Sequence, residues 1–144
     1  MKTQKTFFTL AFVLASIIRL PAARADELDQ ASKITFSQPV QIPGHVLPAG
    51  TYWFLLADVA PNRNVVRIFS SDRSIVYATI LTIAAHRLEP SEKAAITFAE
   101  RGAMQPETIV SWFYPGRDFG HQFVYSRPEQ QELARNKHQT ITVG

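Results

Sequence analysis

The sequence predicts an all-β protein, namely a small antiparallel β-sandwich or partly closed barrel of about seven or eight strands with a short C-terminal helix. Short runs rich in Val, Ile, Thr and aromatic residues are separated by clusters of Pro, Gly, Asn and Asp. Within most runs, side chains of opposite character alternate with a period of two. Helical periodicity is nearly absent before the C-terminal segment.

The first half of the chain predicts several short strands and one interior strand. Residues 33–37 and 40–42 form two short runs that Pro39 separates, and residues 51–58 follow a Pro-Ala-Gly turn. That third run directs aromatic or aliphatic side chains to both faces: Tyr52, Phe54 and Leu56 on one, and Trp53, Leu55 and Ala57 on the other. Because neither face is polar, we expect this strand to lie inside the sheet.

Two reversals follow, at residues 61–64 and 71–73. They predict two hairpins, one that pairs 51–58 with 65–70 and one that pairs 65–70 with 74–86. The run 74–86 is the longest apolar stretch after residue 25. Its apolar side chains point in both directions, so we expect it to be covered on both sides. A bend or bulge is expected within it, because strands of this length are uncommon.

The second half predicts a strand at 95–101 and a hairpin formed by 108–114 and 119–125, joined by a Pro-Gly-Arg-Asp turn. Ser126 and Glu129 have the spacing of a capping box, which predicts a helix ending near residue 136. Residues 140–143 could add a final strand.

The N-terminus predicts a signal peptide at residues 1–25. Lys2 and Lys5 precede an apolar run that is too short to span a bilayer, and cleavage is expected between Ala25 and Asp26. We therefore expect an exported bacterial protein, periplasmic or secreted, whose residues 26–144 form a single β-rich domain. The chain has no cysteine, which excludes disulfides, thiol redox chemistry and a lipid-anchored cysteine.

Removal of this segment changes the charge balance. Four of the fifteen basic residues belong to residues 1–25, and the mature chain then carries a net charge of −1. We expect no nucleic-acid partner and no membrane span after signal removal.

Catalytic and metal motifs are almost absent. The four histidines show no metal-ligand spacing, no presented serine or phosphate-binding glycine loop occurs, and no cofactor is expected. The closest approach to a catalytic pair is Asp118 with His121, which could act as an acid and a base beside a turn. A turn aspartate and a half-buried histidine are the simpler interpretation.

Aromatic residues are the more suggestive feature. Trp112 and Tyr114 share one strand face, Tyr125 belongs to the next strand, and Trp53 lies in an aromatic cluster nearer the N-terminus. Such rings bind sugars, peptides or other rings, although cross-strand aromatic pairs more often fill a sheet core. These four residues are the ligand-binding candidates of the sequence.

Three stretches carry a resemblance to a family. They are the segment 42–52 with its Leu-Pro-Ala-Gly-Thr-Tyr turn, Tyr77-Ala78-Thr79, and the aromatic segment 112–125. On these residues the chain resembles an uncharacterised family of small exported β-rich proteins of soil bacteria, of the acidobacterial type. The resemblance implies export and a β-rich domain, and it assigns no catalytic residue.

The function expected from the sequence is a non-enzymatic periplasmic or secreted module that binds a protein, peptide or glycan partner. One alternative is a small hydrolase or isomerase that uses Asp118 and His121 as an acid–base pair. A structural component of the envelope is the second alternative. The sequence contains no feature that fixes the oligomeric state.

Overall fold

A computed structural model describes residues 30–57, 64–87 and 89–143 of the chain. The described part contains ten strands and one helix. In chain order they are β1 (Ala31–Phe36), β2 (Val40–Ile42), β3 (His45–Leu47), β4 (Gly50–Leu56), β5 (Val65–Ser70), β6 (Val76–His86), β7 (Ala94–Ala99), β8 (Glu107–Phe113), β9 (Phe119–Phe123), α2 (Arg127–Arg135) and β10 (His138–Val143).

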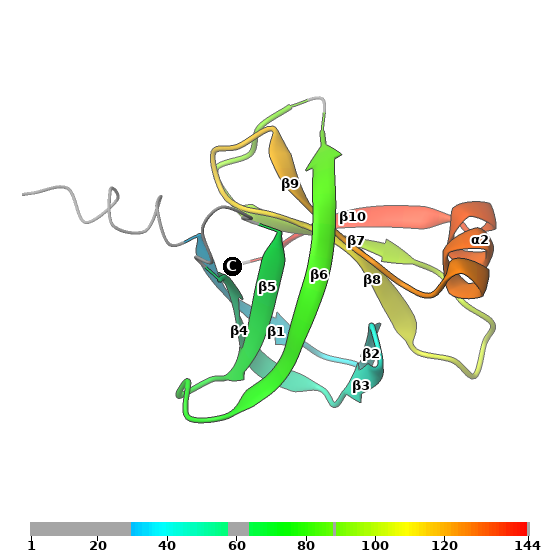
Figure 1. Cartoon of the computed structure of the whole chain (residues 1–144), viewed down its shortest axis with the longest axis horizontal. Coiled ribbons are helices and arrows are strands. Elements are labelled where there is room, and N and C mark those ends of the chain that lie inside the picture. Colours follow the sequence, from blue (N-terminus) through cyan, green and yellow to red (C-terminus); the bar gives the residue numbers. More distant parts are fainter. Residues whose placement is uncertain (1–29, 58–63, 88, 144) are drawn as a thin grey trace, which may run out of the picture.

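Eight strands form one continuous antiparallel path, β1-β4-β5-β6-β9-β8-β7-β10 (Figure 1). β6 connects its two halves, because its first part pairs with β5 and its last part with β9. The short β2–β3 hairpin branches from β8 through a parallel pairing of β2. Among the described strands β1 and β10 are each paired on one edge only, so the sheet is not closed into a barrel.

The predicted fold class is confirmed, with two differences. The structure counts ten strands because residues 45–47 and 138–143 form strands of their own, and the β2–β8 pairing is parallel. The interior position expected for residues 51–58 is also confirmed, since β4 lies between β1 and β5. The predicted turn at 61–64 and the predicted signal peptide lie largely or wholly outside the described residues.

The expectation that the run 74–86 is covered on both sides is wrong. Ala78, Ile80 and Thr82 of β6 are buried, whereas Leu81 is 68% exposed and Ile83 is 50% exposed. The alternate side chains therefore point away from the core and stay in contact with solvent.

The expected bulge is present near the start of β6. Ala78 is opposite Ile68, but Val76 is already opposite Phe69, so Tyr77 is the extra residue. The Tyr77 ring packs edge-on against the buried Tyr52, with 5.5 Å between the ring centroids. The burial pattern departs from alternation at the bulge, because Val76 is 52% exposed although it lies two residues before the buried Ala78.

The core fills the space between the two halves of the sheet. It consists mostly of aliphatic and aromatic residues from every strand except β10, together with Leu133 of the helix. Phe54 is fully buried at its centre, in edge contact with Trp112 and stacked on Phe123. Offset and edge-on ring pairs of this kind add to the stabilisation that comes from burial alone.

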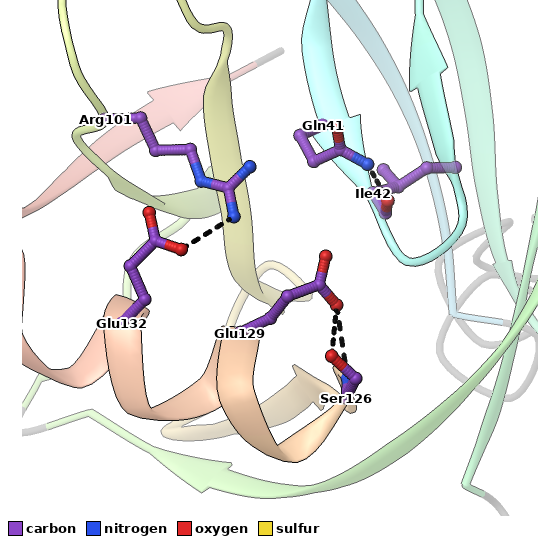
Figure 2. Close-up of polar contacts among 6 residues, drawn as sticks. All are labelled: Gln41, Ile42, Arg101, Ser126, Glu129 and Glu132. Atoms are coloured by element: carbon purple, nitrogen blue, oxygen red, sulfur yellow. Dashed lines mark hydrogen bonds and ion pairs between the residues drawn. The ribbon is translucent and has the colours of Figure 1, made fainter.

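The C-terminal helix α2 forms where the capping box predicts it. The Glu129 carboxylate accepts hydrogen bonds from the Ser126 backbone N–H at 3.3 Å and from the Ser126 hydroxyl at 2.8 Å (Figure 2). Arg101 extends toward the same helix and forms an ion pair with Glu132 at 3.5 Å. Leu133 is the buried residue of α2, so the helix packs on the sheet through a narrow contact.

No described helix is long and apolar enough to cross a membrane.

Candidate functional site

Three of the four candidate aromatic residues lie in the core. Trp112 is fully buried and donates from its indole nitrogen to the Ser32 hydroxyl at 3.2 Å. Tyr114 and Tyr125 are 8% and 7% exposed. The Tyr125 hydroxyl donates to the Ile109 carbonyl at 2.5 Å, and burial raises the pKa of this phenol far above its usual range. These rings stabilise the sheet, and their faces are not open to a ligand.

Trp53 is the candidate that lies near the surface. Its indole N–H donates to the Ser71 carbonyl at 3.0 Å, and the Arg73 guanidinium lies 4.0 Å from the ring centroid. Arg73 has a positive φ of 62° in the turn between β5 and β6. Asp72 holds that turn by accepting hydrogen bonds from Ser70 and Ser74, which lowers the pKa of its carboxyl to about 2. The indole is thus part of a cation–π cluster of the protein itself.

Asp118 and His121 are not brought together. Asp118 is exposed in the turn before β9, where its backbone carbonyl accepts a hydrogen bond from the Arg87 N–H. His121 is 6% exposed and points into the core, with its ring 5.5 Å from the Trp112 ring. Within the described part of the chain no hydrogen bond joins the two side chains, so the geometry does not support an acid–base pair.

His121 is held as a neutral imidazole. Its Nε2 lies 2.9 Å from Gln30 Oε1 and its Nδ1 lies 3.5 Å from the Thr82 hydroxyl. A ring protonated on Nε2 donates to the amide oxygen and accepts from the hydroxyl, which satisfies both nitrogens. Burial lowers the pKa of His121 to about 4.

This pKa predicts a loss of stability in mild acid. Between the unfolded-state pKa of 6.5 and the folded-state value of about 4, the unfolded chain binds a proton that the folded chain rejects. The contribution of His121 to the free energy of unfolding is therefore fully present above pH 6.5. As the pH falls to 4, the free energy of unfolding should decrease by about 3 kcal/mol. Urea denaturation at a series of pH values measures this slope.

Replacing His121 by Gln should flatten this part of the pH profile, because the titrating group is gone. His45, which is exposed in β3, provides the matched control. His45→Gln should keep the wild-type slope. An identical slope in the wild type and in His121→Gln would show that another group carries the acid sensitivity.

The structure forms a groove that the sequence did not indicate. It has a volume of about 780 Å³ and opens between the end of β1, the β2–β3 hairpin, the loop 103–107 and β10. Three large apolar side chains of the lining are exposed: Val46 at 51%, Met104 at 98% and Ile141 at 41%. None of the candidates Trp53, Trp112, Tyr114, Tyr125, Asp118 and His121 lines it.

The groove lies where the sheet fails to close. Phe36 at the end of β1 and Phe98 of β7 meet there edge-on, with 6.2 Å between their ring centroids. Both rings are nearly buried, and each contributes to the groove lining. Glu107 is the one charged residue among the described residues that line the groove. The groove can therefore accept apolar groups, and its described lining offers a single carboxylate.

A second apolar surface covers the outer face of β6. Val65 of β5 is opposite Leu81, and the Val124 backbone N–H donates to the Leu81 carbonyl, so these side chains lie in one row across the sheet. Ile83 extends the surface by one further row. Val65, Leu81, Ile83 and Val124 are not among the residues that the sequence marks as site candidates.

The described residues contain no group of three or more His, Asp or Glu side chains that could hold a metal ion. Comparisons of the chain with protein-family models, with curated proteins and with solved structures found no match. The site must therefore be interpreted from its own geometry.

Proposed function

We propose that this protein is a non-enzymatic binding module of the periplasm or the extracellular space, and that the groove beside β10 is its binding site. The observation that carries the proposal is the convergence of the exposed side chains Val46, Met104 and Ile141 on one groove. Exposing such residues together is unfavourable in water, and clefts with mostly apolar linings are the usual form of ligand sites.

Export is part of the proposal and is supported by the sequence alone. The charged start, the short apolar run and the small residues before Asp26 have the order of a secretory signal. The absence of cysteine is consistent with a domain that is stabilised by packing.

The alternative of a small hydrolase or isomerase has less support. Asp118 and His121 would have to meet the same substrate, but the carboxylate is in solvent and the imidazole is in the core. A purely structural envelope component would need no groove, and the groove is the feature that favours a binding module over this second alternative.

The proposal is tested by screening the purified protein against a glycan array, a peptide library and the neutral apolar dye Nile red. Any ligand of the groove should bind the double variant Val46→Asp/Met104→Asp at least about tenfold more weakly, because two carboxylates then line an apolar site. Both side chains are already exposed, so the fold should tolerate the change.

The control is Leu81→Asp/Ile83→Asp on the outer face of β6, where two exposed apolar residues receive the same charges. Binding should persist in this control. A ligand lost from the control and kept by the groove variant would place the site on the outer face and contradict the proposal. If the protein turns over a substrate and His121→Ala abolishes that turnover, the enzymatic alternative is established instead.

A further inference from the structure

Three described strands have a free edge, and they differ in how that edge is protected. β1 carries Lys33 at its middle, and β3 is only three residues long. A charged side chain on an edge and a short edge strand are both devices that prevent another chain from pairing. β10 is six residues long and has no lysine, no proline and no bulge in its pairing with β7. It is the unprotected edge of the described sheet.

β10 is also almost uncovered. Five of its six residues are exposed and Val143 is intermediate, so the strand is held by β7 on one edge with little burial of its own. The last four residues of the strand, Thr-Ile-Thr-Val, are all β-branched, and such residues favour extended backbone. Such a strand is suited to accept a further strand.

The register shows which backbone groups of β10 are free. The Glu100 N–H donates to the Lys137 carbonyl, and the pairing continues with His138 opposite Ala99. In an antiparallel pair hydrogen-bonded positions alternate with positions that point away, so Gln139, Ile141 and Val143 bond to β7. The N–H and C=O groups of Thr140 and Thr142 therefore point to the open edge.

The groove lies against this edge. Ile141 and Val143 line it, and Phe98 of the neighbouring β7 lines it too. Residues 37–40 and Val46 line it as well. A chain that pairs with Thr140 and Thr142 would direct every second side chain into this apolar groove and the others toward solvent.

We propose that β10 and the groove bind an extended segment of a partner protein, which adds one strand to the sheet. This inference rests on the proposed function and names its ligand class. The segment has apolar residues at alternate positions and is neutral or basic, because Glu107 supplies the only charge that the described residues contribute to the groove lining. Backbone hydrogen bonds give affinity, and the groove selects the alternate side chains.

A second copy of this chain fits less well. The β10 of a second copy would bring its own β7 and the rest of that sheet with it, and the groove is lined by residues 37–40 and Val46 as well as by β10. A single extended segment can lie beside β10 among these residues, whereas a folded domain on the same edge would have to fit against all of them.

The test uses a synthetic peptide of about ten residues, the upper length of ordinary strands. It alternates Val and Thr, carries a Lys at each end and a fluorophore, and is blocked at both termini. One control peptide has the same composition with Val and Thr in separate blocks, and another replaces Lys by Glu. The alternating Lys peptide should bind at least about tenfold more tightly than either control. Equal affinities would overturn the inference.

Two proline variants on free edges locate the binding. Thr140 of β10 and Lys33 of β1 each point their N–H to a free edge, and Lys33 does not line the groove. Thr140→Pro should weaken peptide binding about tenfold or more, since an edge donor is lost, while Lys33→Pro should change it less than about twofold. Equal losses in the two variants would contradict strand addition to β10.

Amide hydrogen exchange gives a readout that does not depend on a variant. Bound peptide should slow exchange at Thr140 and Thr142, and exchange at Lys33 on the free edge of β1 should not change. If Nile red binds the groove and no peptide does, strand addition is wrong and the proposed function stands. If nothing binds the groove, both fail. A dimer that Thr140→Pro dissociates would make a second copy the occupant and also overturn the inference.

Discussion

Replacing Trp112 by Ala is expected to lower the free energy of unfolding by about 4 kcal/mol. The indole is fully buried between Phe54 and His121, with ring centroids 6.0 and 5.5 Å away, and its removal leaves a large cavity. The variant also removes the hydrogen bond to the buried Ser32 hydroxyl. This loss is a large part of the stability of an ordinary domain, and urea denaturation followed by circular dichroism measures it.

Trp53→Ala is the matched control, because it removes the only other tryptophan of the chain. Trp53 is partly exposed and has the Arg73 guanidinium over its ring, so we expect a loss of about 1 to 2 kcal/mol. Similar losses in the two variants would mean that Trp112 does not occupy the centre of the core.

Much of the strand layout could be predicted from the sequence, since alternation and turn residues act locally. The hairpin of residues 65–70 with the following run, the β8–β9 hairpin and the capping box of α2 all depend on neighbours in the chain. Burial does not depend on neighbours alone. Leu81 and Ala78 are both apolar, but the sheet covers Ala78 and leaves Leu81 in solvent.

The candidate site could not be predicted in the same way. The groove exists because Phe36 and Ile141, at opposite ends of the described chain, come to line one opening. A short stretch of sequence does not specify where a series of paired antiparallel strands ends without closing into a barrel. The aromatic residues that cluster in the sequence around Trp112 and Tyr125 belong to the core, where large rings remove the most apolar surface from water.

Gly120→Ala is expected to destabilise the protein by about 3 kcal/mol. A Cβ atom at this position of β9 would lie 2.4 Å from the Trp112 carbonyl oxygen and 2.6 Å from Cδ1 of Phe113. Both distances are far below contact. The carbonyl belongs to the backbone of β8 and cannot rotate away, so the β8–β9 pairing must shift. Comparing the urea midpoints of the variant and the wild type measures the loss.

Gly102→Ala is the control for this prediction, because a Cβ there has no neighbour within 4 Å and the loop is exposed. Its effect should be within about 0.5 kcal/mol of zero. Since Gly120 sits beside the strand that carries Trp112, the Gly120→Ala loss should be smaller in the Trp112→Ala background, where the β8 backbone can relax into the cavity. Strict additivity of the two losses would show that the clash is not with the β8 backbone.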